Sequence, residues 1–79
     1  MPVIELFEGI KILIFSNDHN PPHFHVYYAN YKAMIEISSL KIIKGDLPNK
    51  QYQKVVEWAS LRQKELLDYF ETLNPQLRK

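Results

Sequence analysis

The amino-acid sequence predicts a single α+β domain over residues 1–79, in which an antiparallel sheet of about five strands packs against one long C-terminal helix. Two observations predict this fold. Short apolar segments separated by turn residues occupy roughly residues 3–44, a pattern typical of a strand hairpin followed by a three-stranded meander. From about residue 50 to 73 the apolar side chains instead recur with a helical period, and a short tail follows.

The five expected strands are residues 3–7, 10–16, 23–28, 32–37 and 40–44. Gly9 lies in the first turn, where glycine supplies the backbone freedom of a tight hairpin. Ala29 and Asn30 join the third strand to the fourth, and asparagine tolerates the left-handed conformation that such turns need. Apolar and polar residues alternate along the fourth strand, with Met34 as the exception on the polar side, so this strand is expected to have one apolar and one polar face.

The helix is expected after a loop at residues 45–49, where Asp46 or Asn49 would cap it and Pro48 fits the first turn. At a rise of 1.5 Å per residue the helix would be about 35 Å long, enough to cross a five-stranded sheet. Its apolar face is wide, which indicates that a partner covers part of it. Trp58 is expected to anchor the helix on the sheet, with partner contact as the weaker alternative.

Composition restricts how so small a chain is stabilised. Cysteine is absent, which excludes disulfides and thiolate metal sites and leaves a metal held by nitrogen and oxygen ligands, or association with another chain or a second copy. The hydrophobic content of 46% is typical of a folded protein. No apolar run is long enough to span a membrane and the N-terminal segment does not resemble an export signal, so we expect a cytoplasmic protein without membrane attachment.

The formal net charge of +1 does not predict a strongly basic nucleic-acid-binding protein. One stretch is nevertheless rich in lysine and holds a single acid, Asp46; its lysines are Lys41, Lys44, Lys50 and Lys54. A modest phosphate-facing patch is one interpretation of this stretch, whereas a solvated strand edge and helix start is the more usual one. Nucleic acid is therefore a weakly supported partner.

All the histidines of the chain lie in one short segment, which also contains an acid. They are His19, His23 and His25, with Asp18 beside them. Two consecutive prolines at residues 21–22 make this loop stiff and extended, because proline fixes its own backbone and restricts the residue before it. The concentration of histidine in one stiff loop makes it the candidate functional site.

Strand periodicity predicts where these side chains point. Residues two apart on a strand share a face, so His23, His25 and Tyr27 are expected on one face of the third strand and Phe24 and Val26 on the other. The second set is apolar and is expected to face the core. The histidines are then expected at the rim of the sheet or facing solvent.

Three functional interpretations fit this histidine loop. The first is a metal site, because His19, His23 and His25 would supply the three nitrogen ligands of an open catalytic zinc or a similar divalent ion. The second is acid–base chemistry, in which one histidine transfers protons, another histidine or Asp18 orients it, and Lys32 or Lys11 binds a phosphate.

The third interpretation is recognition, in which the histidines and neighbouring tyrosines, above all Tyr27, form a contact surface for a partner. The structural alternative is that Asp18 and His19 hydrogen-bond within the loop, while His23 and His25 are ordinary half-exposed strand residues. No nucleophile elbow, phosphate-binding glycine loop or dinucleotide-binding pattern is present in the sequence.

Several segments of the chain together resemble a known family. They are Met1-Pro-Val-Ile4, then Phe7, Gly9 and Ile10, Asn17-Asp-His-Asn-Pro-Pro-His-Phe-His25, Ala33-x-Ile35-x-Ile37, Gly45-Asp-Leu-Pro48, Glu57-Trp-Ala59 and Glu65-Leu-Leu67. In these segments the chain resembles the short bacterial proteins catalogued as domain of unknown function 4160. The resemblance covers about residues 1–70, and Pro-Pro-His-Phe-His is its most specific part.

The resemblance implies a genetic partner. Members of this family tend to be encoded beside another small protein, of the type called domain of unknown function 2442, in pairs that look like toxin–antitoxin modules. The leading hypothesis is therefore a component of such a module that acts through the histidine loop and is bound by a small cognate protein. A metal-dependent or histidine-based nuclease or hydrolase is the first alternative, and a non-catalytic protein-binding module is the second.

Overall fold

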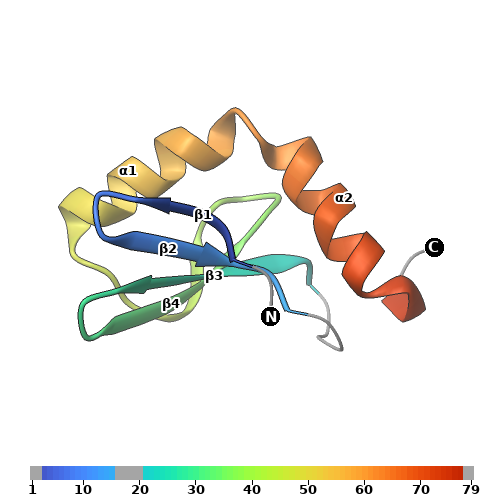
Figure 1. Cartoon of the computed structure of the whole chain (residues 1–79), viewed down its shortest axis with the longest axis horizontal. Helices are drawn as coiled ribbons and strands as arrows, with labels where there is room; N and C mark the ends of the chain where they lie inside the picture. Colours follow the sequence, from blue (N-terminus) through green and yellow to red (C-terminus); the bar gives the residue numbers. More distant parts are fainter. Residues whose placement is uncertain (1–2, 16–20, 78–79) are drawn as a thin grey trace.

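The computed structural model describes residues 3–15 and 21–77, and Figure 1 shows their arrangement. The strands of this described part are β1 (Val3–Phe7), β2 (Ile10–Leu13), β3 (His23–Tyr28), β4 (Tyr31–Glu36) and β5 (Ile42–Gly45). The helices are α1 (Asn49–Ser60), α2 (Gln63–Leu73) and the short 3₁₀ helix η1 (Pro75–Leu77). The α+β class predicted from the sequence is confirmed.

The five strands form one antiparallel sheet in the order β1-β2-β3-β4-β5, so every strand pairs with its neighbours in the sequence. The expected hairpin and meander are thus joined through β2 and β3 into a single sheet. The observed β2 is shorter than predicted, because it ends at Leu13. The last strand begins two residues later than predicted, because Leu40 has a left-handed backbone (φ 59°) and donates its N–H to the Glu36 carbonyl in a tight turn.

Two turns depend on left-handed backbone conformations. Glu8 and Gly9 both have positive φ values, 49° and 78°, as a two-residue hairpin turn requires. Between β3 and β4 the positive φ belongs to Ala29 (50°), whereas the sequence had pointed to Asn30. At the end of β5, Gly45 has a φ of 81°, and a Cβ added there would lie 2.1 Å from the Lys32 carbonyl oxygen, so only glycine lets β5 approach β4 this closely.

The prediction of one long helix is wrong, because α1 ends at Ser60 and α2 begins at Gln63. A straight helix of this length would extend about 36 Å, whereas five strands span only roughly 19 Å. The break allows α2 to turn down past the end of the sheet, as Figure 1 shows. It returns Leu66 and Phe70 to the core, where both are buried.

Hydrogen bonds hold the break in place. The Arg62 N–H donates to the Ala59 carbonyl and closes the last turn of α1. The Gln63 side-chain amide donates to the Ile37 carbonyl at 2.9 Å, which ties the first residue of α2 to the segment that follows β4. The start of α1 also differs from the prediction, because its N-cap position is Pro48 and no side chain caps it.

The core lies between one face of the sheet and the two helices. Its strand members are Ile10, Ile12, Phe24, Val26 and Ile35, its members in the segments after strands are Ile14, Ile37 and Leu40, and its helix members are Val55, Ala59, Leu66 and Phe70. Fully burying one such side chain stabilises a fold by about 1.5–3 kcal/mol, so this cluster carries most of the stability of the domain. Among the described helices none is long and apolar enough to cross a membrane.

Candidate functional site

The histidine loop is only partly described by the structure. Asp18 and His19 lie outside the described residues, so their predicted roles stay predictions. His23 and His25 lie at the start of β3, within the described residues. The two rings are neighbours, with their centroids 5.1 Å apart and their planes at 62°.

His23 does not face solvent as predicted, because only 1% of its surface is exposed. Its Nδ1 donates a hydrogen bond to the Pro21 carbonyl oxygen at 2.8 Å. Its ring also packs against Phe70 of α2, with the centroids 5.6 Å apart. The prediction failed because the bent α2 covers this end of β3, which strand periodicity alone does not reveal. The observed contacts of His23 therefore hold the loop, β3 and α2 together.

Buried Asn74 connects the same end of α2 to the sheet. Its side-chain amide donates to the Phe15 carbonyl oxygen at 2.9 Å and to the Phe70 carbonyl oxygen at 3.0 Å. The ring of Phe15 meets His25 edge-on, at a centroid distance of 4.3 Å. The ring of His25 is thus positioned by aromatic neighbours on two sides, His23 and Phe15.

His25 differs from His23 because it remains half-buried and lines a hollow on the opposite side of the sheet from the core. We call this side the open face and define it by two rows of residues paired across the strands. The first row is Leu6, Lys11, Tyr27 and Lys32, and the second row is Leu13, His25, Met34 and Lys44. Residues paired in this way project from the same face of a sheet, and the two rows lie two residues, or roughly 6.6 Å, apart.

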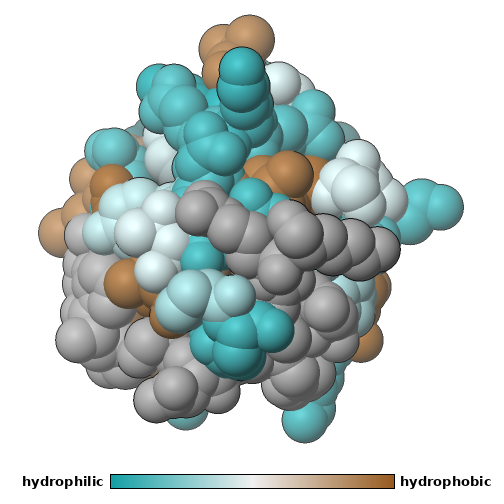
Figure 2. Space-filling model, turned by 90° about the vertical axis from the view of Figure 1, so that its right-hand side faces the viewer, coloured by the Kyte–Doolittle hydropathy of each residue, from teal (hydrophilic) through white to brown (hydrophobic). Residues whose placement is uncertain are grey.

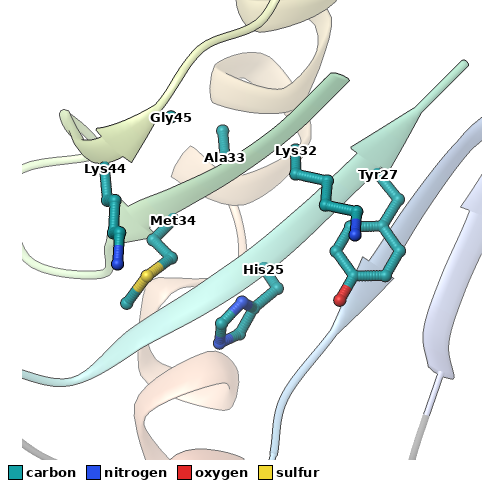
Figure 3. Close-up of a pocket in the computed structure, with 7 residues that line it drawn as sticks. All are labelled: His25, Tyr27, Lys32, Ala33, Met34, Lys44 and Gly45. Atoms are coloured by element: carbon teal, nitrogen blue, oxygen red, sulfur yellow. The ribbon is translucent and has the colours of Figure 1, made fainter. Parts of the chain in front are cut away.

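The hollow is a shallow cavity of about 270 Å³ lined by His25, Tyr27, Lys32, Ala33, Met34, Lys44 and Gly45. Figure 3 shows the side chains of His25, Met34 and Lys44 side by side, from three neighbouring strands. The Lys32 ammonium lies over the Tyr27 ring, 5.5 Å from its centroid. The site thus combines an imidazole, a phenol and two ammonium groups on one surface.

Lysines dominate the charge of the open face. The side chains of Lys11, Lys32 and Lys44 are all exposed. The acid that the described strands place on this face is Glu36, which pairs with His23 one position beyond the second row. Its carboxylate accepts a hydrogen bond from Ser39 Oγ. Four other acids lie on the helices, namely Glu57, Glu65, Asp68 and Glu71. The helical segment also carries four basic residues, Lys50, Lys54, Arg62 and Lys64, which balance its acids, whereas the three lysines of the open face outnumber Glu36.

The lysines that are close together in residues 41–54 lie on different surfaces of the folded protein. Lys44 reaches the open face, whereas Lys50 and Lys54 lie on α1. Lys54 forms an ion pair with Glu8 at 2.5 Å. Sequence reasoning named Lys11 and Lys32 as candidate phosphate-binding cations but did not join them to Lys44 or to Met34. Only the pairing of the strands shows that Lys11, Lys32, Lys44 and Met34 lie on one face.

Trp58, named as a possible partner contact, is half-buried against the core. Its ring stacks with Phe7, with the centroids 6.1 Å apart. The Arg62 guanidinium lies 5.0 Å from the ring centroid and donates from Nη1 to the Trp58 carbonyl. Trp58 thus anchors α1 on β1. Tyr27, the other predicted contact, lies on the open face.

Of the three histidines predicted to bind a metal, the structure describes His23 and His25. His23 Nδ1 is engaged by the Pro21 carbonyl, so a metal would bind this ring through Nε2. Within residues 3–15 and 21–77, no group of three or more histidine or acidic side chains is arranged to hold a metal ion. A three-histidine site would need His19, which lies outside that part of the chain.

The end of the molecule beside α2 offers a different surface from the open face. Among the described residues, which it draws in colour, Figure 2 shows mainly hydrophilic atoms, with hydrophobic atoms in small separate areas. Small separate areas of this kind are normal on protein surfaces and do not indicate a docking site. The open face of the sheet is the stronger candidate for chemistry, because its hollow gathers His25 with Lys32 and Lys44.

Comparison with known families gives a match over residues 9–71 to the family described as Domain of unknown function (DUF4160). The matched range includes every residue of the two rows except Leu6. No curated protein and no solved structure matches the chain.

Proposed function

The chain belongs to the family described as Domain of unknown function (DUF4160), and we propose that it is the effector half of a bacterial two-protein module of toxin–antitoxin type. Its working surface is the open face around His25. One observation supports the choice of surface: His25 lies in a shallow hollow between exposed lysines, whereas His23 is buried in a structural contact. The cognate partner, a small protein resembling domain of unknown function 2442, silences the effector by covering that hollow.

The geometry supports an effector because the open face carries reactive groups and is not simply an apolar docking surface. Proton transfer needs an accessible imidazole, and binding of a charged substrate needs a cation close to it. His25 and Lys44 lie in the same cross-strand row, and Lys32 lies in the next. An apolar contact surface would not need this combination.

Growth of a bacterial host tests the proposal. Expression of the protein alone is expected to slow growth, and co-expression of the protein encoded beside it is expected to restore growth. A His25→Gln variant should be less harmful at equal soluble expression, because glutamine keeps the polarity of the side chain but does not transfer protons. A Gln53→Ala variant on exposed α1 is the matched control. Normal growth with soluble wild-type protein would refute the effector role.

A second candidate is a histidine-based nuclease or hydrolase that acts without its partner. The observation that favours it is that one partly exposed histidine and two lysines line the same hollow. Incubation of the purified protein with RNA and DNA should give cleavage that His25→Gln removes. Cleavage that survives the substitution would come from a contaminant.

A metal-dependent form of this enzyme would use His19, His23 and His25. Elemental analysis of untagged protein beside a His23→Ala/His25→Ala variant tests it. Near-stoichiometric metal that is lost in the variant would support this form. Protein that is empty in both cases, after incubation with zinc, nickel, iron and manganese, would contradict it.

A further inference from the structure

The open face brings together lysine and aromatic side chains that are far apart in the sequence. In the first row, Lys11 of β2, Tyr27 of β3 and Lys32 of β4 are direct cross-strand partners. In the second row, His25, Met34 and Lys44 are partners across β3, β4 and β5. Tyr27 therefore lies between two lysines, with a third lysine at the far end of the neighbouring row.

Three exposed ammonium groups on one face favour an anionic chain as the ligand. Each lysine that contacts a phosphate releases a counterion, and this release supplies most of the affinity of non-specific nucleic-acid binding. Glu36 is the acid that the described strands place on this face, so the three lysines leave it with an excess of positive charge; four further acids belong to the helices. Repeated phosphates along one strand can meet all three lysines, whereas a single small anion meets only one or two.

Tyr27 provides a surface for stacking. Tyr27 is partly exposed, and the Lys32 ammonium lies over one face of its ring. An exposed contact of this kind is weak, and the lysine side chain is flexible. A nucleic-acid base can take the place of the ammonium on the ring while Lys32 turns to a phosphate. Base–aromatic stacking tolerates any base, because every base has a π face.

The shape of the face distinguishes single strands from duplexes. The hollow is shallow and open, and all the residues that line it belong to β3, β4 and β5, so no helix of the site is available to enter a groove. Duplex bases are stacked inside the helix and cannot reach a tyrosine on a flat sheet, whereas the bases of a single strand can be splayed onto it. We propose that the open face binds single-stranded nucleic acid through Lys11, Lys32 and Lys44 on the phosphates and Tyr27 on a base. This inference rests on the proposed function, because it names the ligand class of the same surface.

Fluorescence anisotropy with a labelled oligouridylate of about twelve nucleotides measures this binding directly. The wild-type protein should bind oligouridylate and oligothymidylate of equal length within about threefold of each other, because no contact to the sugar 2′-OH is invoked. A duplex of the same length should bind at least about tenfold more weakly, because it cannot stack on Tyr27. Binding of the duplex as tight as that of the single strand, or no binding at all, would overturn the proposal.

Charge variants identify the face. Lys32→Ala/Lys44→Ala should weaken binding by about tenfold at about 50 mM salt, and should reduce the slope of log affinity against log salt from about −2 to about −0.7. Lys50→Ala/Lys64→Ala removes two lysines from the helices and is the matched control, with a loss of less than about twofold expected. Equal losses in the two pairs would show general attraction to a basic protein and would overturn the assignment to this face.

Stacking is tested with Tyr27→Ala and Tyr27→Phe. The alanine variant should lose about tenfold in affinity and the phenylalanine variant almost nothing, because stacking needs the ring and not the hydroxyl. Thermal unfolding of both variants checks that the fold is intact. Growth assays separate this inference from the proposed function. Growth arrest by a protein that does not bind oligonucleotide would refute the inference alone, and binding by a harmless protein would refute the effector role alone.

Discussion

Phe24 and Val26 of β3 point to the helices and are fully buried, whereas the intervening His25 and the following Tyr27 point to the open face and remain partly exposed. The two faces of one strand thus carry different chemistry. The open face is not needed to supply the apolar surface that the helices bury.

This difference shows where function is to be sought. A solvated sheet face is stable with many kinds of polar residue, so folding does not require lysine, tyrosine and histidine in two aligned rows. Side chains gathered there without a packing reason point to a ligand. Substitutions on the two faces should therefore separate stability from binding.

The largest expected effect is on the covered face. Phe24→Ala removes a fully buried ring and should lower the free energy of unfolding by about 3–5 kcal/mol, which leaves so small a domain largely unfolded. Tyr27→Ala, three residues further along the same strand, should lower it by only about 1 kcal/mol. Urea denaturation followed by circular dichroism measures both. Similar losses at the two positions would remove the distinction between the faces.

His23 and His25 allow a buried and a partly exposed histidine to be compared within one strand. His23→Ala should destabilise the protein by about 2–3 kcal/mol, because it removes a buried ring and its hydrogen bond to Pro21. His25→Ala should lower the free energy of unfolding by about 1 kcal/mol, since its ring is half-exposed. The same denaturation experiment decides the order. A larger loss at His25 would contradict the assignment of His23 as the structural histidine.

Asn74 tests whether α2 is fixed to the end of the sheet. Asn74→Ala removes the hydrogen bonds to the Phe15 and Phe70 carbonyls and should lower the free energy of unfolding by about 2 kcal/mol. Gln53→Ala, on the exposed side of α1, should change it by less than about 0.5 kcal/mol. Hydrogen exchange should also show faster opening of α2 in the Asn74 variant. Unchanged exchange in α2 would contradict the proposed connection.

The smallest expected effect on stability is on the open face. Lys32→Ala/Lys44→Ala should change the free energy of unfolding by less than about 0.5 kcal/mol, because both side chains are exposed. The same variant should lose most of its affinity for single-stranded oligonucleotide. Thermal unfolding beside the anisotropy measurement checks both statements on one sample. A marked loss of stability would mean that these lysines support the fold.

Much of the sheet could be predicted from the sequence. The residue range of β3 was predicted correctly, because alternation in residues 23–28 is a local property of the chain. The helix break was missed, although the apolar stripe contains Arg62 and Gln63 where apolar residues would continue it. These two polar residues indicated that the helix ends there. The break was missed because the apolar residues on either side of them still fit one helical period.

The site was predicted in part. The sequence placed His25 and Tyr27 on one face, as observed, but it could not show that Phe70 buries His23, because that contact joins residues far apart in the chain through the turn of α2. The approach of Lys11, Lys32 and Lys44 likewise depends on the pairing of separate strands. Such long-range register is a tertiary property and is not readable from any one segment.

One measurement tests the central claim that the open face is the working surface of the protein. Met34 lies on this face beside His25 and Lys44, and its neighbour Ile35 points into the core. Methyl NMR of protein labelled at methionine and isoleucine, titrated with single-stranded oligouridylate, compares the two directly. We expect the Met34 methyl signal to shift while that of Ile35 stays in place. A static Met34 signal, or equal shifts at both methyl groups, would contradict it.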